Sequence, residues 1–186
     1  MTHEAQLQTL LASDPVRMRI LRTVQGLALP DCWVAAGFVR SLVWDHLHQR
    51  DGSMLPEDID VIWYDTARAD AATDGALEAE LSSRYGGLNW SVKNQARMHV
   101  RNADRPYTSA ADAMTHWPET ATAVGVRLGR EGRMEISAPL GLEDLFSLTV
   151  RCTARFKAEK QAIFLERIQS KAWRDRWPKL IFPGEP

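Results

Sequence analysis

The chain has 186 residues, of which 45% are hydrophobic and 25% charged, and its formal net charge at neutral pH is -1. This length allows one well-buried core, and the mean hydropathy of -0.31 is ordinary for a globular protein in water. A net charge near zero argues against tracking a long nucleic acid by bulk electrostatics, and no stretch approaches the roughly 18 apolar residues that a membrane span needs.

The N-terminus and the cysteines bear on the compartment in which the protein works. No basic stretch precedes an apolar segment at the N-terminus, so we do not expect a signal peptide there. Cys32 and Cys152 lie far apart in unrelated contexts, which argues against a disulfide framework and against a zinc site. We therefore expect a cytoplasmic protein.

Hydrophobic periodicity and turn residues predict helices at both ends of the chain and a strand-rich centre. Two helices open the chain, separated by Ser13-Asp14-Pro15, which is typical of a helix end followed by a new start. The further predicted elements are a strand at 32–36, a helix at 38–48, a strand at 58–64, a helix at 76–85, a strand at 88–95, a helix at 109–115, a hairpin at 123–128 and 133–138, and helices at 140–150 and 156–173.

This order of elements predicts an α/β (α+β) protein: a small mixed β-sheet with helices on one side and helical additions at both termini. No repeat, linker or low-complexity segment interrupts it. We therefore expect a single domain over residues 1–186, made of N-terminal helices (1–28), a core (29–150) and a C-terminal helix and tail (151–186).

Two aspartates at the start of the predicted strand 58–64 carry the clearest chemical signal. Because side chains alternate along a strand, Asp58 and Asp60 project from the same face, with Cα atoms about 6.5–7 Å apart. Two carboxylates this close repel each other, and a bound divalent cation removes that cost. Mg²⁺ suits the pair because it takes carboxylate oxygens together with the phosphate oxygens of a substrate. The alternative is a solvated pair without a metal.

The turn before the helix 38–48 is a second candidate feature. Ala36 and Gly37 follow the predicted strand, and the start of the helix would present free backbone amides and its positive end to a phosphate. Gly37 would let a phosphate approach the backbone without a Cβ in the way. Arg40, in the first turn, would contact a phosphate or else form a surface salt bridge. A metal pair beside a phosphate-binding turn indicates phosphoryl or nucleotidyl transfer.

Residues 35–40 followed by 58–61 resemble the head of nucleotidyltransferases of the DNA polymerase β type, a superfamily that includes CCA-adding and antibiotic-modifying enzymes. Segments 92–99, 117–120 and 138–145 extend the similarity to a family of bacterial nucleotidyltransferase-like proteins of unknown substrate, over most of residues 33–180. The resemblance implies a nucleotidyltransferase fold, an NTP and Mg²⁺ as partners, and an unknown small-molecule or macromolecular acceptor. Ala36-Gly37 stands where the superfamily usually has Gly-Gly or Gly-Ser.

The superfamily pattern also includes a third carboxylate on a later strand, and Glu135 is the best candidate for it. Its apolar neighbours Met134 and Ile136 would face the helices, which leaves Glu135 on the same side of the sheet as the two aspartates. The alternative is an ion pair with Arg127 or Arg133 across the hairpin. Without a third carboxylate, the chain would be a catalytically inactive nucleotide-binding or interaction module. A toxin-like or antitoxin-like partner protein is a third possibility.

A polar run on and after the predicted strand 88–95 supplies further candidates. A nucleotide-binding role would place Lys93 or Arg97 on the triphosphate and Asn94 or Gln95 on the base or sugar. The structural alternative is an exposed edge strand.

The last part of the chain is locally basic, since residues 151–179 contain nine Lys or Arg and three acidic residues. Such a segment forms either a solvated helix face or a wall that meets phosphates, and the second interpretation requires a binding site nearby.

Overall fold

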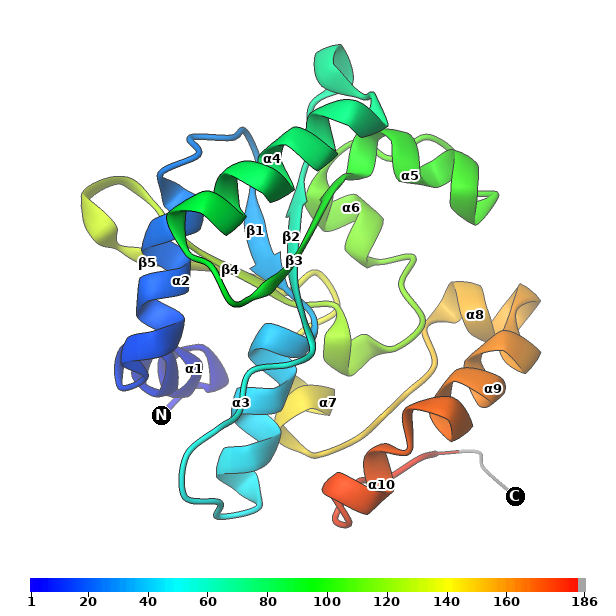
Figure 1. Ribbon diagram of the computed structural model, residues 1–186. Coiled ribbons are helices and arrows are strands. Elements are labelled where there is room, and N and C mark those ends of the chain that lie inside the picture. The colour runs from blue at the N-terminus through cyan, green and yellow to red at the C-terminus, as the bar shows by residue number, and fades with distance from the viewer. Residues whose placement is uncertain (184–186) are drawn as a thin grey trace.

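A five-stranded sheet with the order β3-β2-β1-β4-β5 forms the centre of the computed structural model, which describes residues 1–183 (Figure 1). Its strands are β1 (Trp33–Ala35), β2 (Asp58–Trp63), β3 (Asn89–Asn94), β4 (Gly125–Leu128) and β5 (Met134–Ser137). β2 and β3 are parallel, whereas β1 pairs antiparallel with both β2 and β4, and β4 pairs antiparallel with β5. The predicted small mixed sheet is confirmed.

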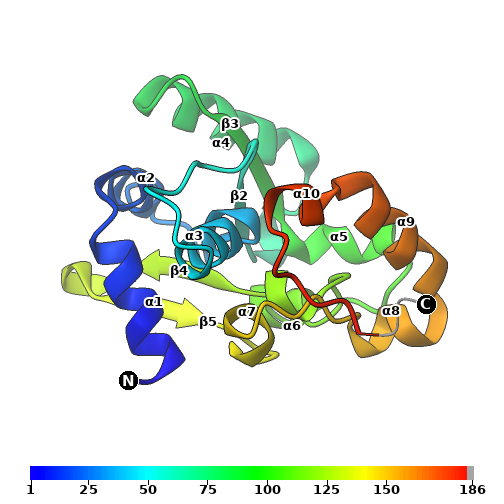
Figure 2. The same ribbon diagram turned by 90° about the horizontal axis from the view of Figure 1, so that it is seen from below.

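Helices precede the sheet, connect its strands and follow it. They are α1 (His3–Ala12), α2 (Pro15–Gln25), α3 (Gly37–Leu47), α4 (Ala71–Arg84), α5 (Gln95–Asn102), α6 (Ala110–Met114), α7 (Glu143–Phe146), α8 (Ala154–Glu159), α9 (Gln161–Lys171) and α10 (Trp173–Arg176), with short 3-10 turns η1 (Thr66–Arg68), η2 (Thr120–Thr122) and η3 (Arg130–Gly132). α8, α9 and α10, in orange to red, lie on the opposite side of the molecule from α1 and α2 (Figure 1, Figure 2). No helix in the described part of the chain is long and apolar enough to span a membrane.

The alternation of β2 decides which face of the sheet carries the main core. Ile59, Val61 and Trp63 are buried in it, together with apolar side chains from α1, α2, α3 and the C-terminal helices. Ile62 points to the other face, where Ala110 and Met114 of α6 pack against it. The helices are therefore not confined to one side, because an apolar side chain on the second face also needs a cover.

Several element boundaries differ from those predicted. α4 begins at Ala71, before the predicted start at residue 76, because Asp70 caps it by accepting a hydrogen bond from the Thr73 amide at 2.8 Å. The predicted helix 156–173 is broken at Lys160 and again at Ala172, whose φ is 45°. The predicted helix 140–150 shrinks to the four residues of α7, and α5 was not predicted.

Candidate functional site

Asp58 and Asp60 lie at the beginning of β2 and line a cleft of about 420 Å³. Asp58 is exposed and accepts a hydrogen bond from the Asn89 side chain, whereas Asp60 is half-buried. Burial and then the charge of Asp58 raise the pKa of Asp60, while a hydrogen bond from Ser91 and the charges of Arg40 and Arg167 act in the opposite direction. The site thus holds two close carboxylates, one of which is costly to ionise.

This donor set fits a hard divalent cation. Asp58 and Asp60 offer carboxylate oxygens from one strand face, and a cation between them would relieve the repulsion that raises the pKa of Asp60. Among residues 1–183, no group of three or more His, Cys, Asp or Glu side chains is arranged to hold a metal ion. A cation at the pair would therefore take its remaining ligands from substrate and water, as Mg²⁺ commonly does.

The turn between β1 and α3 brings a helix N-terminus to the same cleft. Ala36 lines the cleft and has φ 53° and ψ -118°, a conformation that costs energy for any residue with a Cβ. α3 starts at the next residue and has no side-chain cap, which leaves its first amides available for an anion. Gly37 itself is buried, and a Cβ there would lie 3.0 Å from Pro56 Cβ. The structure thus gives Gly37 a packing role, and Ala36 is the residue that faces the cleft.

Arg40 lies behind the cleft and does not line it. Its guanidinium carbon lies over the rings of Trp44, Trp173 and Trp177, at 5.2, 4.8 and 5.6 Å from their centres. Burial lowers the pKa of Arg40 to about 10, against the opposing charge of Glu119. Two alternatives were considered for Arg40, a phosphate contact and a surface salt bridge, and its buried position matches neither. From this position the charge of Arg40 acts on Asp60.

Of the polar run after β3, Lys93 and Gln95 line the cleft. Lys93 Nζ also lies 2.8 Å from Glu78 Oε1, so its charge is shared with α4. The Gln95 side chain donates to the Lys93 carbonyl at 3.0 Å. Because both residues line the cleft, their predicted nucleotide-binding role stays a prediction that the geometry allows.

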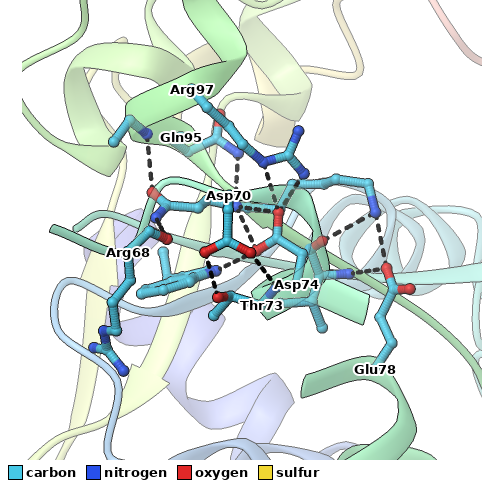
Figure 3. Close-up of polar contacts among 12 residues, drawn as sticks. Arg68, Asp70, Thr73, Asp74, Glu78, Gln95 and Arg97 are labelled. Carbon is cyan, nitrogen blue, oxygen red and sulfur yellow. Dashed lines mark hydrogen bonds and ion pairs between the residues drawn. The ribbon is translucent and has the colours of Figure 1, made fainter. Parts of the chain in front are cut away.

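Asn94 and Arg97 take part in a different structure, a polar network around the buried Asp74. Figure 3 shows Arg97 and Asp74 in this network. Asp74 accepts hydrogen bonds from the Asn94 amide at 3.0 Å, from Trp63 Nε1 at 2.8 Å and from Arg97 Nε at 3.0 Å. The Asn94 side chain is fully buried and donates to the carbonyls of Asp65 and Arg68. The predicted nucleotide contacts of Asn94 and Arg97 are not supported by this geometry, because alternation turns Asn94 to the core face of the sheet.

Glu135 does share the sheet face of the aspartates but not their site. It lies on the edge strand β5, which β4 and β1 separate from β2, a lateral distance of about 14 Å at ordinary strand spacing. Its carboxylate pairs with Arg127 across the hairpin, with Arg127 Nη2 2.6 Å from Glu135 Oε2, and it lines a separate cleft with residues of α2. The expectation that Glu135 completes the carboxylate site is therefore corrected. The alternation of side chains along a strand predicts the face of the sheet, but it does not predict the order of the strands, and that order places Glu135 far from the aspartates.

Glu135→Gln is accordingly expected to leave turnover within about twofold of the unmodified protein. The half-exposed ion pair with Arg127 contributes little, so the free energy of unfolding should change by about 1 kcal/mol or less. Steady-state kinetics and a denaturant titration check both expectations. A loss of turnover by a hundredfold would return Glu135 to the catalytic site.

Three side chains of the basic C-terminal segment line the same cleft as the aspartates: Lys160, Arg167 and Lys171. Arg167 and Lys171 lie one helical turn apart on α9, so both reach the same wall. Lys160 Nζ donates to the Asn102 carbonyl at 2.6 Å. The interpretation of the basic segment as a wall that meets phosphates requires a nearby cleft, and these three residues line one, so for them it stays a prediction. Their helical spacing was the signal that could have singled them out.

The comparisons with known proteins agree with this geometry. A family profile described as nucleotidyltransferase matches residues 22–182. A solved structure reported as an NMR structure that reveals a CCA-adding enzyme head domain is 35% identical, has a TM-score of 0.83 and covers 96% of each chain. No curated protein matches the sequence significantly.

More distant structures share the fold. The Thermotoga maritima CCA-adding enzyme complexed with tRNA is 17% identical with a TM-score of 0.57, covering 95% of this chain and 42% of its own. A CCA-adding enzyme with CTP is 16% identical with a TM-score of 0.53, covering 91% of this chain and 47% of its own. This chain thus spans less than half of the length of these enzymes. Since the family profile extends from α2 to the end of the described chain and takes in the aspartate pair, the chain belongs to the nucleotidyltransferase family.

Proposed function

We propose that the protein transfers a nucleoside monophosphate from an NTP to a hydroxyl group of an acceptor, with Mg²⁺ held by Asp58 and Asp60. The observation that carries this proposal is the half-buried Asp60 beside Asp58, in a cleft that cationic side chains also line, with the α3 N-terminus at one side. A carboxyl with a raised pKa that lies beside a second carboxylate in a cleft is typical of a functional site.

In such a transfer the acceptor oxygen forms a bond to the α-phosphorus, and the bond from that phosphorus to the β-phosphate oxygen breaks. Pyrophosphate leaves with the bonding electrons, and the acceptor proton passes to solvent. Mg²⁺, when bound, supplies charge neutralisation at the phosphates. The chain itself supplies position: the amides at the start of α3 and the ammonium of Lys93 bind phosphate oxygens, and Trp117 and Phe156 limit the access of water to the cleft.

The nature of the acceptor follows less directly from the cleft. The structures of CCA-adding enzymes with CTP and with ATP, and of the Thermotoga maritima enzyme with tRNA, support an NTP as the donor. They do not choose between a small molecule and a macromolecule for this chain, which spans only part of those enzymes. The assay must therefore offer both.

The test is incubation of the protein with each of the four NTPs, Mg²⁺ and either a metabolite extract or an RNA pool. We expect pyrophosphate release that EDTA abolishes, together with a new adduct heavier than its acceptor by one nucleoside monophosphate residue. Asp58→Asn run in parallel controls for contaminating enzymes, because its release should fall to background. Release that persists in Asp58→Asn, or NTP consumption without EDTA sensitivity, would contradict the proposal.

A catalytically inactive nucleotide-binding module is the second candidate, and one observation favours it: the described residues supply only two carboxylates at the site, since Glu135 lies elsewhere. This candidate predicts Mg²⁺-dependent NTP binding by calorimetry with no pyrophosphate release from any acceptor pool. The two outcomes of the same assay separate the enzyme from the module.

A further inference from the structure

We propose that Arg167 of α9 holds the polyphosphate of the donor nucleotide and that Glu119 is the positioning residue that aims its guanidinium into the cleft. The inference rests on the proposed function and adds a phosphate-binding group from outside the strand and turn that carry the aspartates.

Glu119 is an unusual anchor because it is a completely buried carboxylate, with 0% of its side chain exposed. It lies just before η2, accepts a hydrogen bond from Thr122 Oγ1 at 2.9 Å, and its backbone forms a bridge with Cys152. Its other oxygen accepts a charge-assisted hydrogen bond from Arg167 Nε. A buried carboxylate is tolerated only when it is paired in this way, so the Arg167 side chain is fixed at its Nε.

The Arg167 side chain also reaches the cleft. Arg167 lines it together with Asp58 and Asp60, and 35% of its side chain is exposed. Within residues 1–183, no hydrogen-bond acceptor pairs with Nη1 or Nη2. A guanidinium that is held at Nε and open at both Nη atoms presents the planar pair of donors that binds phosphate oxygens.

The surroundings hold this donor pair close to the aspartates. Two guanidiniums contact the ring of Trp173, whose centre is 4.8 Å from Arg40 Cζ and 5.7 Å from Arg167 Cζ. Burial and the charge of Asp58 raise the pKa of Asp60, and the charge of Arg167 partly opposes that rise, which places the guanidinium within electrostatic range of Asp60. An anion bound between Arg167 and a cation at the aspartate pair would therefore contact both, which is the position of a nucleotide polyphosphate.

If the pair of Glu119 and Arg167 served only to hold α9 in place, the guanidinium would not need to line the cleft. Other core carboxylates bind the C-terminal helices through pairs that leave no donors in the cleft: Asp45 accepts from Trp177 Nε1 at 2.7 Å and from Arg176, and Asp104 accepts from Arg155 Nε at 2.9 Å. None of those five residues lines the cleft, whereas Arg167 does.

The experiment measures binding of inorganic tripolyphosphate in EDTA, by calorimetry at fixed ionic strength, so that the result does not depend on the metal or on turnover. Arg167→Ala should weaken binding about tenfold or more, because a charge-assisted pair is lost. Lys157→Ala is the matched control: it removes the same charge from an exposed position on α8 that does not line the cleft, and should stay within about twofold. Binding by Arg167→Ala at the unmodified affinity would overturn the inference.

Two further variants guard the interpretation. Arg167→Lys keeps the charge without the planar donor pair and should give an intermediate loss, and it replaces Arg167→Ala if thermal melting shows that the latter does not fold. Glu119→Gln should change the tripolyphosphate affinity at least about threefold in the unmodified protein and have no effect in the Arg167→Ala background, since coupled residues are not additive. Equal effects in both backgrounds, or none in either, would remove Glu119 from the inference.

The outcome also separates this inference from the proposed function. If Arg167→Ala binds tripolyphosphate normally while Asp58→Asn loses EDTA-sensitive pyrophosphate release, the function stands and the assignment of Arg167 fails. If the unmodified protein shows neither Mg²⁺-dependent NTP binding nor pyrophosphate release, the proposed function itself fails, whatever tripolyphosphate does.

Discussion

Asp60→Asn is expected to reduce nucleotidyl transfer by at least about a hundredfold while leaving the metal-free protein as stable as before or more stable. The loss of activity follows because a neutral amide neither balances the charge of a divalent cation nor orders it beside the phosphates. The stability result has a separate cause, since burial and the charge of Asp58 raise the pKa of Asp60. In the metal-free protein at neutral pH, the ionised Asp60 therefore costs folding free energy that asparagine does not.

The sign of the pH dependence follows from the raised pKa. A carboxyl that binds its proton more tightly in the folded state loses stability as the pH rises from its ordinary value through the raised one. The gain in melting temperature from Asp60→Asn should be fully present at neutral pH and should vanish below the ordinary aspartate pKa, where both states are protonated. Thermal melts in EDTA across this range check the expectation, with Glu135→Gln as a control of equal charge change far from the site. A large loss of stability at neutral pH would mean that Asp60 is structural.

The sequence predicts the sheet and the acid pair because both follow from local rules. Alternation along 58–64 places Asp58 and Asp60 on one face and Ile59 in the core, and the structure has this arrangement. Turn residues predict the hairpin of β4 and β5 in the same way, since Gly129 and Gly132 lie between two short apolar strands.

The failures arise where non-local placement decides. The alternation of side chains along β5 places Glu135 on the same face of the sheet as the aspartates. Only the strand order shows that β4 and β1 lie between Glu135 and the aspartates. The role of Arg167 depends on the docking of α9 against η2, far away in the sequence, so no window of residues around it predicts Glu119 as its partner. A site built from separate segments is visible only once the chain is folded.

The nucleotide contact predicted for Asn94 is not supported for a local reason instead. Asn94 ends the strand and caps α5, accepting a hydrogen bond from the Ala96 amide at 3.0 Å. A short polar side chain at a strand end serves a helix cap and a ligand contact equally well, so composition does not separate the two roles. The helix that follows, α5, has few apolar residues, and it was not predicted.

Asp74→Ala is expected to lower the free energy of unfolding by about 3–5 kcal/mol, the largest stability effect that we expect from a single change in this protein. The side chain is 3% exposed, and its loss leaves the Trp63 indole, the Asn94 amide and the Arg97 guanidinium without their acceptor in the interior. Asp70→Ala is the matched control on the same helix: it removes an exposed cap that accepts from the Thr73 amide and should cost only about 1 kcal/mol. Denaturant titrations of both variants measure the difference.

The same variant decides whether the network around Asp74 reaches the nucleotide. Asp74, Asn94 and Arg97 do not line the cleft, whereas Lys93 and Gln95 do. At a temperature where Asp74→Ala is still folded, its NTP affinity per folded molecule should therefore equal that of the unmodified protein. If affinity falls well beyond the unfolded fraction, and Arg97→Ala reproduces that fall without loss of stability, then Arg97 contacts the nucleotide after all. In that case its pairing with Asp74 serves to hold a ligand-binding guanidinium, as Glu119 is proposed to do for Arg167.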